Sequence, residues 1–324
     1  MTGIEAPDVG SLATPSAAIQ QLLADIGPRW AADINHHRDQ MVRAYTPLLA
    51  AHSLPGLRVT RDLPYGTHTR QRLDLYQGQD QGQGPETGSA AAQRPIMMFV
   101  HGGAFVRGQK DSNDQVYGNV ARLFARHGWL GVNVEYRLAP EAPFPAGALD
   151  VGLAVDWVRA HAAEFSGDAS RIVLMGHSAG GAHVASYLCD PRCRPNRPKI
   201  AGAILVSARL RADVRPDNPN AQGVIAYFGA DEMRYAADSA VSHAQHLNVP
   251  TLLAVAEYEN PWLDVYAAEF CHQAGLAQGR IPRLICVPRH NHTSIVAHLD
   301  SACGDDTFGE ALLDFARHLP PCPS

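Results

Sequence analysis

The sequence indicates chemistry most directly at Ser178. This serine is the centre of a Gly-x-Ser-x-Gly pattern at residues 176–180 (GHSAG), and the mostly apolar residues 171–175 (RIVLM) come directly before it. Small residues lead from the pattern into residues 182–188, so the segment is typical of a strand, a sharp turn and a helix. The glycines leave room where a Cβ would meet a neighbouring strand or helix. We therefore interpret Ser178 as a nucleophile in an elbow-shaped turn, which requires a base and an acid elsewhere in the chain.

A second segment supplies the N–H groups that such a nucleophile needs. Residues 101–105 (HGGAF) follow a continuous apolar strand expected at residues 96–100. A serine that attacks a carbonyl creates a negatively charged oxygen, which fixed backbone donors must stabilise. Gly102 and Gly103 let the backbone approach a substrate closely, and Ala179, directly after the nucleophile, adds a third donor. An ordinary Gly-Gly turn is the alternative, but the elbow elsewhere in the chain favours an oxyanion hole.

The elements that must position these residues alternate between apolar strands and helices. Such alternation predicts a mostly parallel sheet with helices on both faces. The eight expected strands are residues 57–63, 70–76, 96–100, 129–134, 171–175, 200–206, 251–256 and 283–287. The expected helices are residues 116–126, 148–163, 182–188 and 263–274, with one or more within 294–318. The first two strands are joined by a turn, and we expect them to pair antiparallel.

The segment before the sheet is expected to be helical. Residues 14–51 carry two apolar faces that Pro28 separates. We treat residues 1–56 as an N-terminal helical extension, which either packs as a decoration or caps a site, and residues 57–324 as one catalytic domain. Residues 77–94 are rich in Gly, Gln and Ala, which predicts a flexible surface loop rather than a domain linker.

Composition and charge exclude several classes of protein. The chain has 324 residues, of which 46% are hydrophobic and 18% charged, and a formal net charge of −5. These values fit one large α/β domain and argue against nucleic acid or an anionic membrane as a partner. Six scattered cysteines favour neither a disulfide scaffold nor a metal site. Without a secretory signal or a run of about 20 apolar residues that could span a membrane, the expectation is a cytoplasmic protein.

Three segments together carry a family resemblance. They are residues 101–105 (HGGAF), 136–146 (YRLAPEAPFPA) and 176–181 (GHSAGG). Together they resemble the hormone-sensitive-lipase-like carboxylesterase group of α/β-hydrolases, and the second segment is highly specific to that group. The resemblance covers about residues 57–318 and implies an α/β-hydrolase fold. Ala104 in place of a third glycine, and the segment around Glu259, are similar to the neighbouring kynurenine-formamidase-like branch.

The resemblance implies where the base should be. The family places a histidine on the loop after the last strand, where this chain has His290 and His292. His292 immediately precedes the last helical stretch, as in the family, so we expect it to be the base. His290 is expected to pack within the loop, and His177 to pack beside the nucleophile without doing chemistry.

The acid is implied in the same way. It should follow the strand expected at residues 251–256, and residues 259–261 (ENP) match the formamidase-like pattern with Glu in place of the usual Asp. We therefore prefer Glu259 as the acid. Asp264 and Glu257 are the alternatives.

These residues imply acyl transfer through an acyl-enzyme, without a metal or other cofactor. Phe105, Trp262, Tyr227 and Phe228 are candidate substrate-binding residues, since aromatic walls suit an aryl or short acyl group. We expect a small-molecule ester as substrate, with an arylformamide such as N-formylkynurenine as the alternative. A non-catalytic ligand-binding protein of this fold is a third hypothesis. The sequence is silent on oligomeric state, and analogy with related folds alone suggests a homodimer.

Overall fold

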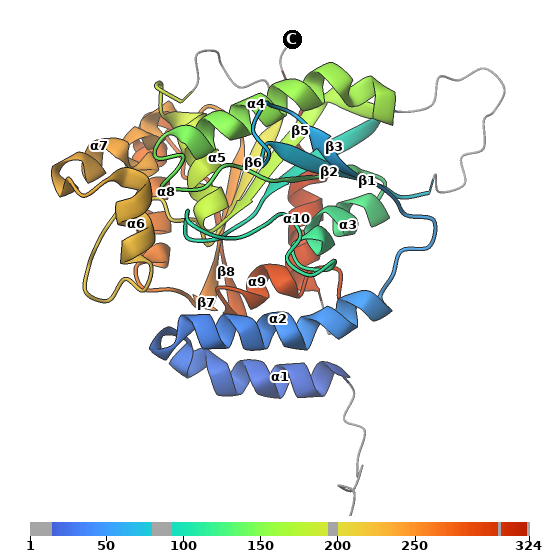
Figure 1. Ribbon diagram of the computed structural model, residues 1–324, viewed down its shortest axis with the longest axis horizontal. Helices are drawn as coiled ribbons and strands as arrows, with labels where there is room; N and C mark the ends of the chain where they lie inside the picture. Colours follow the sequence, from blue (N-terminus) through green and yellow to red (C-terminus); the bar gives the residue numbers. More distant parts are fainter. Residues whose placement is uncertain (1–14, 80–92, 194–199, 304–305, 323–324) are drawn as a thin grey trace, which may run out of the picture.

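An eight-stranded sheet runs through the computed structural model, which describes residues 15–79, 93–193, 200–303 and 306–322 (Figure 1). In spatial order the strands are β1 (Arg58–Pro64), β2 (Arg72–Gln77), β4 (Leu130–Val134), β3 (Arg94–Val100), β5 (Gly167–His177), β6 (Gly202–Val206), β7 (Thr251–Tyr258) and β8 (Arg283–Asn291). Strand β2 pairs antiparallel with β1 and with β4, and every other neighbouring pair is parallel. The prediction of a mostly parallel sheet that opens with an antiparallel pair is confirmed.

The central strand β3 divides the core between the two faces of the sheet, because successive side chains of a strand point to opposite faces. The helices of one face are α4 (Ala146–His161), α5 (Ala179–Cys189) and α8 (Leu263–Gln278), and those of the other are α3 (Gly118–Arg126), α9 (Ser294–Ala297) and α10 (Thr307–Arg317). Ile96, Met98 and Val100 are buried in the first cluster, and Met97 and Phe99 in the second. Helices cover both faces, as the sequence predicted.

The N-terminal segment is helical, as expected. Its elements are α1 (Pro15–Ile26), the 3-10 helix η1 (Gly27–Ala32) and α2 (Ile34–Ala51). Pro28 lies in η1 and so separates the two helices. Figure 1 shows α2 between α1 and α9, and apolar residues such as Ile26 and Met41 pack against Val116 and Ala297 of the main body.

The helices between β6 and β7 were not predicted from the sequence. They are α6 (Ala221–Phe228), η3 (Glu232–Arg234), α7 (Tyr235–Asp238) and η4 (Ala240–His246). Helices of one or two turns carry too little periodicity to be recognised from the spacing of apolar residues. The expected helical stretch at residues 294–318 is divided into α9 and α10, and the short η2 (Ala162–Phe165) follows α4. The loop expected at residues 77–94 falls mostly outside the described residues.

Candidate active site

Ser178 lies between β5 and α5, where the elbow pattern places it. Its backbone has φ 56° and ψ −117°, a conformation that residues with a Cβ rarely adopt. A Cβ on Gly176 would lie 2.6 Å from the carbonyl oxygen of Gly180, and a Cβ on Gly180 would lie 2.2 Å from that of Val100. The turn therefore needs glycine at both positions, and it holds the serine at the start of α5.

Three side chains from distant parts of the chain form a continuous row of polar contacts. His292 directly follows β8, and its Nε2 lies 3.0 Å from Oγ of Ser178. The Nδ1 of His292 contacts Oε1 of Glu259, which directly follows β7. The backbone N–H of His292 also donates to the carbonyl of Tyr258 at 3.2 Å, so the two loops are joined through their backbones. The structure thus brings together the serine, the base and the acid expected from the sequence.

The carboxylate of Glu259 is held by its own loop. The backbone N–H groups of Ala256 and Asn260 donate to it at 3.3 and 2.8 Å. Burial raises the pKa of this carboxyl, but the charge and hydrogen bond of His292 and the N–H of Asn260 outweigh burial, so its pKa is lowered below the ordinary value. Glu259 is therefore ionised at neutral pH. The side-chain oxygen of Asn260 accepts the indole N–H of Trp30 at 2.8 Å, which ties this loop to η1.

His177 supports the base without taking a proton. Its Nε2 donates to the backbone carbonyl of His292 at 2.8 Å, and the two rings lie 4.8 Å apart. Burial, together with the nearby His292, lowers the pKa of His177 well below its ordinary value. The imidazole is therefore neutral and acts as a fixed donor, which agrees with the packing role expected for it.

The competing residues lie away from the nucleophile and base. Nδ1 of His290 lies 3.1 Å from Oγ of Ser294. Glu257 is exposed at the end of β7, and Asp264 is exposed in the first turn of α8. Of the three acids considered, Glu259 is the one that contacts the base.

Residues 101–105 (HGGAF), here called the glycine loop, lie with their backbone against the nucleophile. A Cβ on Gly102 would lie 3.1 Å from Cβ of Ser178 and 2.9 Å from Nδ1 of His177, so no larger residue fits there. Within the described residues, the backbone N–H groups of Gly102 and Gly103 donate to no backbone carbonyl. Ala179 opens α5, whose first N–H groups have no acceptor within the helix. Gly102 and Ala179 thus adjoin the serine, and Gly103 lines the same cavity.

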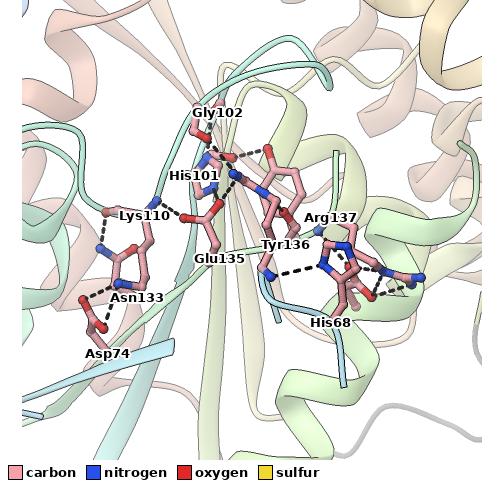
Figure 2. A network of polar contacts seen from close by, with 12 residues as sticks. His68, Asp74, His101, Gly102, Lys110, Asn133, Glu135, Tyr136 and Arg137 are labelled. Carbon is pink, nitrogen blue, oxygen red and sulfur yellow. Dashed lines mark hydrogen bonds and ion pairs between the residues drawn. The ribbon is translucent and has the colours of Figure 1, made fainter. Parts of the chain in front are cut away.

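A buried ionic network holds this glycine loop in place (Figure 2). The carboxylate of Glu135 lies 3.3 Å from Nε2 of His101, accepts the backbone N–H of Lys110 at 2.7 Å and pairs with Arg70. It therefore ties His101, the first residue of the loop, to Lys110 further along the same connection. The sequence analysis did not single out Glu135, although it directly precedes the family-specific segment that begins at Tyr136.

That family-specific segment now has structural roles. The hydroxyl of Tyr136 donates to the carbonyl of His101 at 3.0 Å, and the two rings stack with centroids 4.4 Å apart. Arg137 pairs with the fully buried Asp150 of α4 at 2.7 Å. The segment thus connects the glycine loop to the helical layer.

A cavity of about 290 Å³ lies over the nucleophile. The residues that line it around the nucleophile and the base are Gly102, Gly103, His177, Ser178, Asn260, His292 and Thr293. Its outer wall includes Trp30 of η1, five α2 residues (Ile34, Asn35, Arg38, Asp39 and Val42), and Arg107 and Asn220. The N-terminal helical segment thus forms part of the wall of the active-site cavity.

The four aromatic residues expected to bind substrate lie elsewhere. Phe105, Tyr227 and Phe228 are buried in one cluster, in which the rings of Phe105 and Tyr227 stack at 4.7 Å. Trp262 is half-buried, and its indole N–H donates to Asp217 at 2.9 Å. None of the four is among the described residues that line the cavity. Phe105, Tyr227 and Phe228 pack against one another, whereas Trp262 packs against Tyr266 and Arg215. Aromatic type alone therefore does not separate a pocket wall from a packed core.

Among the described residues, no group of His, Cys, Asp or Glu side chains is arranged to hold a metal ion. No described helix combines the length and the apolar character needed to cross a membrane.

Comparison with known proteins places this arrangement in a family. Residues 85–261, more than half of the chain, match the BD-FAE family, and the match includes the glycine loop, the elbow and Glu259. The chain belongs to the BD-FAE family. The part that matches BD-FAE does not include α2 or His292, which the fold brings to the same cavity.

Relatives with sequence similarity include two proteins of Mycobacterium tuberculosis. Esterase LipC is 36% identical over 121 residues, which are 37% of this chain and 27% of LipC. Carboxylesterase NlhH is 46% identical over 88 residues, which are 27% of this chain and 26% of NlhH. The matches thus span only about a quarter of the length of either relative.

Solved structures extend the likeness over nearly the whole chain. The bacterial heroin esterase superposes with a TM-score of 0.68 at 23% identity, covering 95% of this chain and 100% of the other. The hyperthermophilic esterase from Pyrobaculum calidifontis gives 0.66 at 20% identity, with 93% and 98% covered. The α/β-hydrolase fold and the resemblance to hormone-sensitive-lipase-like carboxylesterases are confirmed.

Proposed function

We propose that this chain hydrolyses small carboxylic esters, with Ser178 as nucleophile, His292 as base and Glu259 as acid. The observation that carries the proposal is the row of contacts from Oγ of Ser178 through the imidazole to the carboxylate, beside a cavity of about 290 Å³. The similarity to esterases and carboxylesterases supports the same class of reaction.

The first half of the reaction would form an acyl-enzyme. Nε2 of His292 accepts the Ser178 proton as Oγ attacks the substrate carbonyl, and Glu259 stabilises the resulting imidazolium. The carbonyl oxygen becomes negatively charged and accepts hydrogen bonds from the N–H groups of Gly102, Gly103 and Ala179. When the tetrahedral intermediate collapses, the alcohol leaves with the proton that the imidazole carries.

The second half releases the acid product. Water takes the place of the alcohol and gives its proton to His292 as its oxygen attacks the acyl carbonyl. The same three N–H groups stabilise the second oxyanion. Oγ of Ser178 then leaves with the proton from the imidazole, which restores the resting contacts.

Replacement of the nucleophile tests the proposal. We expect Ser178→Ala to lower kcat for p-nitrophenyl acetate and butyrate by about 10⁴-fold or more, since the remaining groups cannot form an acyl-enzyme. A fluorophosphonate probe should label the wild type and not the variant, and circular dichroism should show that both are folded. A variant that keeps its esterase activity, or a wild type that is neither labelled nor active, would overturn the proposal.

The same assays distinguish the other two hypotheses. Faster turnover of N-formylkynurenine than of either p-nitrophenyl ester, lost in Ser178→Ala, would make the chain an arylformamidase with the same nucleophile. Absence of labelling and of turnover in a folded protein would favour a non-catalytic ligand-binding protein.

A further inference from the structure

Arg107 carries a positive charge at the rim of the active-site cavity. It lines the same cavity as Ser178 and comes four residues after Gly103 in the chain. Its backbone N–H donates to the carbonyl of Gly103 at 3.0 Å, so the loop turns back on itself and places Arg107 beside an oxyanion donor. The side chain is exposed and lines the cavity, so a molecule bound there can contact it.

The guanidinium of Arg107 has only neutral partners. It donates to the side-chain oxygens of Asn35 and Asn220 at 3.4 and 3.3 Å, both long for a charged donor. In the described part of the chain, no carboxylate lies within ion-pair distance of it, whereas the neighbouring Arg38 pairs with Asp39 at 2.8 Å. The two asparagines hold the guanidinium in place, and neither carries a charge that could pair with it.

The other ionisable groups of the cavity do not offset this charge. Arg38 and Asp39 cancel each other, and burial lowers the pKa of His177 so that it is neutral. Burial and the nearby Arg38 lower the pKa of Arg107, and together they outweigh the opposing effects of Tyr117 and Asp39. A guanidinium presents two parallel N–H groups, which can donate to both oxygens of a carboxylate at once.

We propose that the cavity selects esters that carry a carboxylate, and that Arg107 binds this group while the ester carbonyl is held at Ser178. This inference rests on the proposed ester hydrolysis and names its substrate class. Arg107 determines specificity and takes no part in proton transfer, so its effect should appear as a preference between matched substrates.

Matched pairs of substrates measure that preference, with the carboxylate placed either in the alcohol part or in the acyl part of the ester. On the alcohol side, 4-acetoxybenzoate is compared with its methyl ester, because the two differ only in charge and a methyl group. On the acyl side, mono-p-nitrophenyl adipate is compared with p-nitrophenyl hexanoate. We expect the wild type to have the higher kcat/KM for the anionic member of at least one pair. Raising the salt concentration from about 0.05 to about 0.5 M should reduce that preference, since the charge is near solvent.

Variants assign the preference to Arg107. We expect Arg107→Gln to lower the ratio of kcat/KM values, anionic over neutral, by about tenfold, as for the loss of one partly exposed charge-assisted contact. Arg107→Lys should lower this ratio by about threefold, because lysine keeps the charge but lacks the two parallel N–H donors of the guanidinium. Arg43→Gln is the matched control, since Arg43 is exposed on α2 and is not among the residues that line the cavity. It changes the net charge equally and should leave the ratio unchanged.

Binding without turnover separates this inference from the proposed function. Calorimetric titration of Ser178→Ala should give tighter binding of 4-acetoxybenzoate than of its methyl ester, and adding Arg107→Gln should remove the difference. Equal ratios in wild type and Arg107→Gln, with equal binding, would overturn the inference while leaving ester hydrolysis in place. Preference for a cationic ester such as 4-(trimethylammonio)phenyl acetate would also overturn it, and would point to Asp39 instead. A wild type without esterase activity whose Ser178→Ala variant still prefers the anion would overturn the proposed function alone.

Discussion

At the residue scale, the least usual feature is a glutamate in the position of the acid. A glutamate side chain is one methylene longer than aspartate, and the loop after β7 accommodates it by turning the carboxylate back onto its own backbone. The N–H groups of Ala256 and Asn260 fix the oxygens of Glu259. The acid is thus held by short-range contacts within its own loop, and from there it reaches His292.

Glutamate as the acid leads to a prediction about charge. We expect Glu259→Gln to lower kcat by about 10²–10⁴-fold with a small change in KM, because an uncharged amide cannot stabilise the imidazolium. Glu259→Asp should retain more activity, since the charge remains but the reach is shorter. Steady-state kinetics on p-nitrophenyl butyrate would measure both.

The two alternative acids provide the controls for this experiment. Asp264→Asn and Glu257→Gln should keep activity near that of the wild type, since both side chains are exposed and neither contacts the base. Loss of activity in either of them, with activity retained in Glu259→Gln, would show that the acid has been wrongly assigned.

Residue types located the groups that we propose to react more directly than they located the walls of the cavity. Ser178, Glu259 and His292 could be found because each directly follows a strand, and parallel strands deliver their ends to one edge of the sheet. Phe105 could not be placed, because an aromatic side chain suits a pocket and a core equally well. Arg107 was missed because a single arginine is ordinary on any surface, and its unpaired charge becomes visible only when its neighbours are known.

At the element scale, the glycine loop depends on a network that joins several strands. Asp74 of β2 binds Nζ of Lys110 at 2.9 Å, and Glu135, just after β4, binds the backbone of Lys110 and the ring of His101. The pKa of Glu135 is lowered although burial raises it, because His101, the backbone N–H of Lys110 and Arg70 together favour the charged form. The loop is thus fixed from the sheet as well as by its own hydrogen bonds.

This network should influence turnover through the position of the oxyanion donors. We expect Glu135→Gln to lower kcat by about tenfold with little change in KM, since donors that are displaced lose transition-state stabilisation. It should also lower the free energy of unfolding by about 2 kcal/mol, a value reduced for the partial exposure of Arg70. Kinetics well below the melting temperature, with urea unfolding, would measure both.

The control for this variant lies six residues further along the chain. Glu141→Gln removes an exposed carboxylate whose ion-pair partner among the described residues is His68, at 3.3 Å, and it should change neither quantity. A rise in KM with unchanged kcat in Glu135→Gln would contradict a positioning role for the network.

Elements were predictable where burial produced long apolar runs. Strands β3 and β6 are buried along most of their length, so their sequences read as continuous apolar segments. Helices α6 and α7 and the 3-10 helices beside them were not expected, because tertiary packing rather than periodicity defines such short elements. The place of α2 could not be predicted either, since the polar residues that face the cavity look like an ordinary solvated helix face.

At the scale of the whole molecule, the active site is assembled from both ends of the chain. Trp30 and α2 close one side of the cavity, while His292 and its loop close another. The hydrogen bond from Trp30 to Asn260 connects the N-terminal segment to the residue beside the acid. We therefore propose that residues 1–56 act as a cap, because their helical part shapes the space above the nucleophile.

The whole molecule also carries a set of buried neutral histidines, which should make its stability depend on pH. Burial lowers the pKa of His290 to about 2, with help from the adjacent His298, and lowers the pKa of His183 to about 3. Both values lie below the ordinary pKa of about 6.5 that applies in the unfolded chain. Below that pH the unfolded chain takes up protons that the folded chain does not, so stability is complete above about pH 6.5 and falls as the solution becomes more acidic.

We expect the free energy of unfolding to drop between pH 7 and pH 5 by about 2 kcal/mol for each such histidine, since each pH unit below 6.5 costs about 1.4 kcal/mol per group. His290→Asn removes one titrating group, so the variant should show a drop smaller by that amount, whatever its stability at pH 7. His318→Asn is the control, because its side chain is 79% exposed and its removal should leave the dependence unchanged. Urea unfolding at pH 7, 6 and 5 measures how steeply the free energy of unfolding changes with pH.

Equal pH dependence for the wild type and His290→Asn would show that His290 takes up its proton in the folded state. Its packing against His298, with ring centroids 4.1 Å apart, argues against that outcome.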